Sequence, residues 1–82
     1  MIRKSDLQEW VIEALNGKDG RASIVEVCEY IWAHHENDLK NNSGDLFYTW
    51  QYDTRWAATA LRKAGKMKSA TSSRRGIWEL RK

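Results

Sequence analysis

Residues 49–65 read Thr-Trp-Gln-Tyr-Asp-Thr-Arg-Trp-Ala-Ala-Thr-Ala-Leu-Arg-Lys-Ala-Gly, and this segment carries the clearest helical pattern of the sequence. At about 100° per residue, its side chains divide into the two faces of an amphipathic helix. The inner face holds Trp50, Asp53, Ala57, Ala60, Leu61 and Ala64, and the outer face holds Gln51, Tyr52, Arg55, Thr59 and Arg62. We therefore expect a helix over residues 49–64, with Gly65 as its C-terminal cap.

Two further amphipathic patterns precede this segment. Residues 6–15 carry apolar side chains at helical spacing, namely Leu7, Trp10, Val11, Ala14 and Leu15. Ser5 and Gln8 have the spacing of a capping box, and Asn16-Gly17 should end this helix. Residues 24–35 show the same pattern in Ile24, Val27, Cys28, Ile31 and Trp32, after a second capping box made by Ser23 and Glu26.

Short or polar segments connect these helices. Residues 21–23 are long enough for one edge strand, and the polar residues 36–45 predict a loop that also carries Phe47 and Tyr48. After the last helix, residues 66–70 and 77–80 are strand-like and are joined by the polar loop 71–76. We expect Trp78 and Leu80 to face the core.

The order is thus helix, short strand, helix, helix, strand, loop, strand. This is the order of an α+β winged helix-turn-helix domain, with three helices and a C-terminal β-hairpin wing. The 82 residues suffice for one such domain over residues 1–82, and the aromatic side chains supply much of its small core. In a winged helix, the third helix enters the DNA major groove and the wing lies on the backbone or in the minor groove.

Charge is distributed unevenly along the chain. Residues 1–45 hold five bases and nine acids, a balance of −4, whereas residues 46–82 hold nine bases and two acids, a balance of +7. Clustered Lys and Arg residues are what phosphate contacts need, so this pattern favours a polyanion bound to the second half. The alternative is a solvated basic surface.

The types and spacing of the residues argue against an enzyme, a metal site and a membrane protein. No residue set has the spacing of a nucleophilic triad, a phosphate-binding loop or a pair of catalytic carboxylates, so we expect a binding domain without a cofactor and not an enzyme. His34 and His35 are adjacent on a helix and should not share a metal ion, and His35 should pack at the helix end. Cys28 is the single cysteine and is read as a core thiol. No signal peptide or membrane span is evident, which predicts a cytosolic protein.

The expected DNA contacts follow from residue chemistry. Gln51 suits the adenine edge and Arg55 suits guanine, while Arg62 and Lys63 are expected on phosphates. Thr49 suits either a phosphate or an N-cap, and Arg55 could instead pair with Asp53 or Asp45. The full predicted set is Tyr48, Thr49, Gln51, Tyr52, Arg55, Trp56, Thr59, Arg62, Lys63, Ser72, Ser73, Arg74 and Arg75.

Four segments also resemble a known family. Residues 22–27 (Ala-Ser-Ile-Val-Glu-Val), 49–56, 61–65 and 75–80 (Arg-Gly-Ile-Trp-Glu-Leu) are similar to winged-helix domains of Mrr-like and other modification-dependent restriction endonucleases. The resemblance implies a reader of a short double-stranded DNA site containing N6-methyladenine, which serves a nuclease domain in the same chain or in a partner. An exposed Tyr or Trp beside Arg55 could contact the methyl group.

Two alternatives from other classes stay open. The aromatic side chains of the third helix could anchor a protein partner or a dimer, as aromatics and Arg do at interface hot spots. A free-standing transcription regulator is the third reading, and the sequence shows no effector pocket or dimerisation helix for it. We expect the isolated domain to be a monomer.

Overall fold

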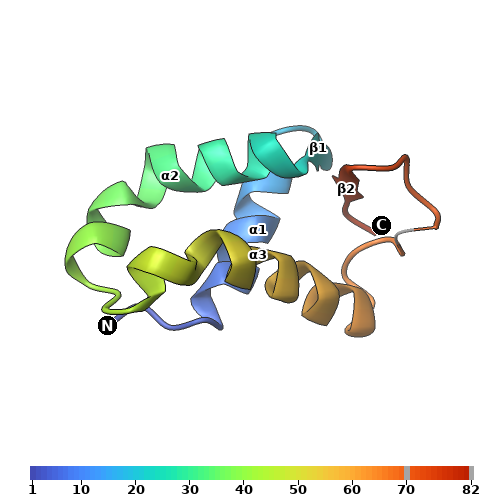
Figure 1. Ribbon diagram of the computed structural model, residues 1–82. Coiled ribbons are helices and arrows are strands. Elements are labelled where there is room, and N and C mark those ends of the chain that lie inside the picture. The colour runs from blue at the N-terminus through green and yellow to red at the C-terminus, as the bar shows by residue number, and fades with distance from the viewer. Residues whose placement is uncertain (70, 82) are drawn as a thin grey trace.

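The computed structural model describes residues 1–69 and 71–81, which form an α+β domain of three helices and a two-stranded antiparallel sheet (Figure 1). Along the chain, the elements are α1 (Asp6–Asn16), β1 (Arg21–Ser23), α2 (Ile24–Asn41), α3 (Leu46–Lys63) and β2 (Ile77–Glu79). The three helices and the strands predicted near residues 21–23 and 77–80 are therefore found in the predicted order, whereas no strand element lies between α3 and β2 among the described residues.

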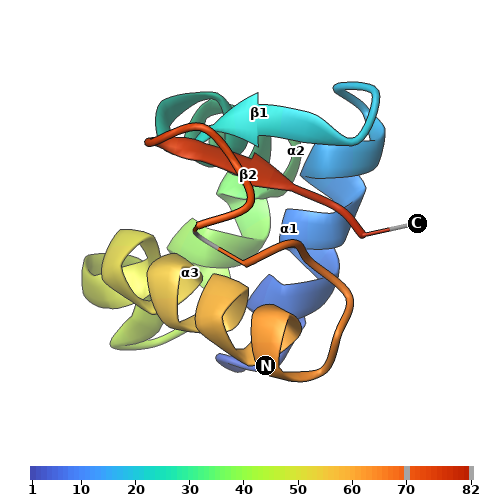
Figure 2. The same ribbon diagram turned by 90° about the vertical axis from the view of Figure 1, so that its right-hand side faces the viewer.

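The sheet joins the segment between α1 and α2 to the C-terminal segment of the chain. Strand β1 pairs antiparallel with β2, and the paired residues are Arg21 with Glu79, Ala22 with Trp78, and Ser23 with Ile77. Figure 2 shows these two strands above α3, with the segment that follows α3 returning to them. The edge strand predicted at residues 21–23 is confirmed.

The predicted hairpin is shorter than expected. On the far side of β2, Met67 bridges Leu80, and the backbone N–H of Lys68 donates to the carbonyl of Glu79 at 2.9 Å. A turn then begins at Ser69, whose carbonyl accepts from the N–H of Ser72 at 3.1 Å. This turn ends the pairing, so the predicted strand 66–70 reduces to one bridge. Ala70, which was part of that prediction, lies outside the described residues.

The core lies between the three helices and is closed by the sheet. The buried side chains of α1 pack on α3, where Ala57, Ala58 and Leu61 allow a close approach. Trp50, Leu61 and Trp78 are buried as predicted, whereas Leu80 is only half-buried against this core. A buried Leu or Phe side chain contributes about 1.5–3 kcal/mol through burial. These contacts hold the inner face of α3 and leave its outer face uncovered.

Helix α2 extends further than predicted. It continues to Asn41 past a kink at His35, where φ is −129° and ψ is 15°. The extra turns are stabilised by the fully buried Leu39 and by an ion pair of 2.7 Å between Lys40 Nζ and Glu36 Oε2. The prediction of a loop over residues 36–45 was therefore wrong for residues 36–41, and the connection to α3 spans only residues 42–45.

Helix α3 begins three residues before the predicted Thr49. Leu46 is buried and belongs to the first turn, so Phe47 and Tyr48 are helical and do not lie in a loop. At the other end, Gly65 has a φ of 78°, and the N–H of Lys66 donates to the carbonyl of Leu61 at 2.9 Å. This is a glycine C-cap, as predicted. Ala64, expected on the inner face, is exposed because the helix ends at Lys63.

The two predicted capping boxes differ in outcome. At α2, the N–H of Glu26 donates to Ser23 Oγ at 3.1 Å, and the N–H of Ser23 donates to Glu26 Oε1 at 3.0 Å. The pair of bonds lowers the pKa of the Glu26 carboxyl. At α1, the prediction was wrong because Ser5 has helical backbone angles and makes no capping bond; Asp6 Oδ2 accepts from the N–H of Arg3 at 2.8 Å.

Candidate nucleic-acid interface

The outer face of α3 presents polar and aromatic side chains to solvent. Gln51, Tyr52 and Arg55 are exposed, as predicted, and Trp56, expected at the boundary, is 58% exposed. The rings of Tyr52 and Trp56 meet edge to face, with 6.2 Å between their centroids. Tyr48, one turn before Tyr52, is 83% exposed. A large apolar side chain costs free energy when it is left in water, so three exposed rings on one helix favour a binding surface.

Arg55 does not take the intramolecular partners considered for it. The Asp53 carboxylate is buried and accepts a hydrogen bond from Thr49 Oγ1 at 2.7 Å, and Lys4 Nζ lies 3.7 Å from Asp53 Oδ1. Among residues 1–69 and 71–81, neither Asp53 nor Asp45 forms an ion pair with Arg55. Neither carboxylate therefore engages the guanidinium group of Arg55, whose side chain is exposed.

Several other predicted contact residues are engaged within the fold. Thr49 is neither an N-cap nor a free donor, because its hydroxyl bonds Asp53. Thr59 is half-buried and donates to the carbonyl of Arg55 at 3.2 Å, and the Arg62 Nε–H donates to the carbonyl of Lys68 at 3.2 Å. Lys63 is exposed. Arg62 thus joins the end of α3 to the segment before the loop.

The loop over residues 71–76 carries the second basic surface. Arg74, Arg75 and Ser72 are exposed, and no ion pair involves either arginine within the described part of the chain. Ser73 is half-buried and donates to Glu79 Oε1 at 3.5 Å. Both guanidinium groups can therefore contact an anion without breaking an internal bond.

Three contacts hold this loop and its base, and one of them joins the loop to α2. The N–H of Ile24 donates to the carbonyl of Gly76 at 3.3 Å, and the N–H of Ile77 donates to the carbonyl of Arg74 at 2.9 Å. Lys68 Nζ lies 3.0 Å from Glu79 Oε2, and this hydrogen bond lowers the pKa of the Glu79 carboxyl. The loop projects from the sheet at the same end of the molecule as the C-terminal end of α3 (Figure 1).

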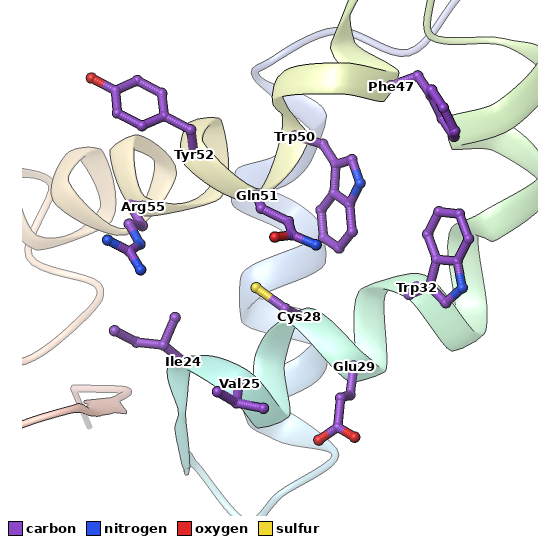
Figure 3. Close-up of a pocket in the computed structure, with 10 residues that line it drawn as sticks. All are labelled: Ile24, Val25, Cys28, Glu29, Trp32, Phe47, Trp50, Gln51, Tyr52 and Arg55. Atoms are coloured by element: carbon purple, nitrogen blue, oxygen red, sulfur yellow. The ribbon is translucent and has the colours of Figure 1, made fainter.

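A cavity of about 750 Å³ separates the outer face of α3 from the start of α2 (Figure 3). We call it the α2–α3 cavity; its lining residues are Ile24, Val25, Cys28, Glu29, Trp32, Phe47, Trp50, Gln51, Tyr52 and Arg55. Helical periodicity did not predict this cavity, because its walls come from two helices. Cys28, predicted as a core thiol, is half-buried in this wall, and burial raises the pKa of the thiol while the positive charge of Arg55 lowers it.

The two adjacent histidines have separate partners. The ring of His35 stacks on Trp10 with 3.9 Å between centroids, and its Nε2 lies 3.1 Å from Glu13 Oε2. The ring of His34 stacks on Tyr30 at 4.0 Å. Within the described ranges, no group of three His, Cys, Asp or Glu side chains is placed to hold a metal ion. His35 packs at the kink within α2 and not at its end.

The chain was also compared with known proteins. No family model, no curated protein and no solved structure matched it. The resemblance to the winged-helix domains of restriction endonucleases therefore stays a prediction from the residues. Of the helices that the structure describes, none combines the length and apolar character needed to cross a bilayer.

Proposed function

We propose that this chain is a winged helix-turn-helix domain that binds double-stranded DNA, with the outer face of α3 in the major groove and the loop 71–76 on the backbone or in the minor groove. The observation that carries the proposal is that Arg55 on α3 and Arg74 and Arg75 in the loop are exposed without ion pairs among the described residues. Phosphates and base edges are the partners that such groups bind.

Strand pairing supports the winged-helix assignment. The first strand pairs with the last, and the last strand also bridges Met67 before the loop. The loop therefore emerges from the sheet beside α3, where a wing would contact the DNA flanking the groove.

The same surface supports selectivity for adenine-methylated sites as part of this proposal. Gln51 has the amide that bonds an adenine edge in the major groove, and the exposed rings of Tyr52 and Trp56 offer apolar contact to an N6-methyl group. Such a reader would act in the cytosol without catalysis of its own, for a restriction endonuclease domain in the same chain or in a partner.

Fluorescence anisotropy tests both parts of the proposal. A panel of labelled duplexes, each with and without N6-methyladenine, is titrated with the protein at low and raised salt. We expect binding that weakens as salt rises, because phosphate contacts release counterions. Equal affinity for both members of every pair contradicts methyl reading alone, whereas no binding at low salt contradicts DNA binding itself.

A protein-interaction domain is the second candidate function. It is favoured by the exposure of Tyr48, Tyr52 and Trp56, which are residue types enriched at interface hot spots. Sedimentation velocity at several protein concentrations separates the two functions. Concentration-dependent association that Tyr52→Ala and Trp56→Ala abolish supports this candidate, and a monomer at all concentrations supports the DNA-binding domain.

A further inference from the structure

The α2–α3 cavity has the dimensions and lining of a small-molecule site. Its volume of about 750 Å³ lies in the range of about 300–1,000 Å³ typical of ligand pockets. Such pockets combine apolar and aromatic walls with a few polar groups that orient the ligand. Both features are present here, and they lie at opposite ends of the cavity.

One end of the cavity is aromatic. The rings of Trp32 and Trp50 are nearly parallel, with 6.0 Å between their centroids and 10° between their planes. Phe47 adds a third ring, 6.5 Å from that of Trp32. Flat aromatic surfaces of this kind pack best against another flat ring system.

The other end is cationic. Figure 3 shows the Arg55 guanidinium extending from α3 toward Ile24, and the Gln51 amide between Trp50 and Cys28. The one carboxylate in the lining belongs to Glu29, which is exposed and directed away from the centre of the cavity in this view. A guanidinium without an ion pair next to an amide is suited to a carboxylate or a phosphate.

From this arrangement, we infer that the α2–α3 cavity binds a small planar aromatic molecule that carries an anionic group. The ring system would pack against Trp32, Trp50 and Phe47, and the anion would bond Arg55. Because Arg55 and Gln51 also belong to the proposed DNA-reading face, the ligand and DNA would exclude each other. The competition rests on the proposed function, whereas the binding of the ligand does not.

The test uses the single cysteine as a reporter in the absence of DNA. Cys28 lies in the cavity wall, so a ligand should protect it from alkylation by N-ethylmaleimide. Indole-3-carboxylate and adenosine monophosphate serve as probes with a carboxylate and a phosphate, and indole is the uncharged control. We expect the anionic probe with the higher affinity to slow alkylation of Cys28 by about tenfold at saturation. The same probe should shift the NMR signals of the Trp32 and Trp50 indole N–H groups.

Variants separate the two ends of the cavity. Arg55→Gln should weaken binding of the anionic probe about tenfold, as a lost charge-assisted bond does, without changing the affinity for indole. Arg74→Gln, which removes an equal charge from the loop, should change neither. Val25→Trp, at a rim position that is 67% exposed, should obstruct the cavity without disturbing the core.

The outcomes are distinct. The inference is wrong if neither anionic probe protects Cys28 at millimolar concentration. It is also wrong if the affinity for indole equals or exceeds the affinity for each anionic probe. Protection by only one probe identifies which of the two molecules, as a combination of ring system and anion, the cavity accepts. Adding that ligand to a preformed complex of the protein with labelled DNA should lower the anisotropy. An unchanged anisotropy contradicts the competition between ligand and DNA. A protein that binds the ligand but binds no DNA contradicts only the proposed function.

Discussion

The first half of the chain, residues 1–45, and the second half, residues 46–81, use their charged groups differently. In the first half, Glu13 lies against His35, Glu36 pairs with Lys40, and Glu26 closes the capping box of α2. These contacts begin helices, hold the kink in α2 and extend the helix past it. Their charges stabilise local structure.

In the second half, the charges divide by position. Arg62, Lys68 and Glu79 bond one another or nearby backbone at the base of the loop. In contrast, Arg55 on α3 and Arg74 in the loop are exposed and form no ion pair within the part of the chain that the structure describes.

Arg3, Lys18 and Arg21 of the first half are likewise exposed without an ion pair among the described residues, but residues 1–45 hold nine acids against five bases, whereas residues 46–82 hold two acids against nine bases. Under the proposed function, the first half is therefore the scaffold and the second half supplies the cations that meet DNA.

The largest effect is expected in the scaffold. Leu39 is fully buried in the part of α2 beyond the kink, and Leu39→Ala should lower the free energy of unfolding by about 2–5 kcal/mol through lost burial and the cavity left behind. Urea denaturation of the variant and of the unchanged chain measures this difference in the free energy of unfolding. Val25→Ala, at an exposed position of the same helix, should change stability by less than about 0.5 kcal/mol. Equal effects of the two variants would contradict the extension of α2.

The next effect concerns Arg55 in the second half. Arg55→Glu should weaken DNA binding by about 1–3 kcal/mol, or roughly 5- to 150-fold, because a base or phosphate contact is replaced by repulsion. Anisotropy titrations measure the change. Lys18→Glu reverses an exposed charge in the first half and should have a much smaller effect. If both reversals weaken binding alike, only net charge matters and the division into halves is wrong.

A smaller effect compares the two predicted capping boxes. Ser23→Ala removes a cap that is formed and should lower the free energy of unfolding by about 0.5–2 kcal/mol. Ser5→Ala removes a hydroxyl that makes no capping bond and should leave stability nearly unchanged. Thermal melts of both variants provide the comparison, and a larger loss for Ser5→Ala would overturn it.

The loop should show a modest effect that depends on salt. Arg74→Gln removes one proposed phosphate contact, so the slope of log affinity against log salt should become less steep by about 0.9. The affinity should fall by a similar factor for every duplex sequence, since phosphates carry no sequence information. A loss restricted to one sequence would instead indicate base reading by the loop.

The smallest effect is a dependence of stability on pH. The hydrogen bond from Lys68 holds the pKa of Glu79 below its ordinary value of 4.5. The folded state therefore gains stability above that value and loses it as the pH falls below 4.5 and through the lower folded-state pKa. Acid titration of the melting temperature should be shallower for Glu79→Gln than for the unchanged chain. A pH dependence that the substitution does not alter contradicts this role.

The sequence predicted the elements that repeat an apolar pattern. Leu7, Val11 and Leu15 indicated α1, and the Ser23 box marked the start of α2 correctly. The end of α2 was missed because Leu39 is a lone apolar residue in a polar run, and its burial depends on the core formed by other segments. The start of α3 was missed because the breaker residues 41–44 predicted a loop that extends to Tyr48, whereas Leu46 is buried in the first turn of the helix.

The candidate site was predicted only in part. The outward direction of Gln51, Tyr52 and Arg55 follows from helical periodicity, and the structure agrees. The bonds from Thr49 to Asp53 and from Arg62 to Lys68 depend on rotamers and on the path of the chain after α3, which periodicity does not report. The α2–α3 cavity needs Trp32 and Phe47 to meet across two helices, and this too is a tertiary property.

Mapping of the DNA surface by NMR tests the division of the molecule most directly. A nitrogen-15-labelled sample is titrated with the tightest duplex of the panel, and the backbone signals are followed residue by residue. We expect the largest shifts at Gln51, Tyr52 and Arg55 and in the loop 71–76, with small changes in α1. Shifts concentrated in α1 and the C-terminal part of α2, or no shifts at low salt, would contradict it.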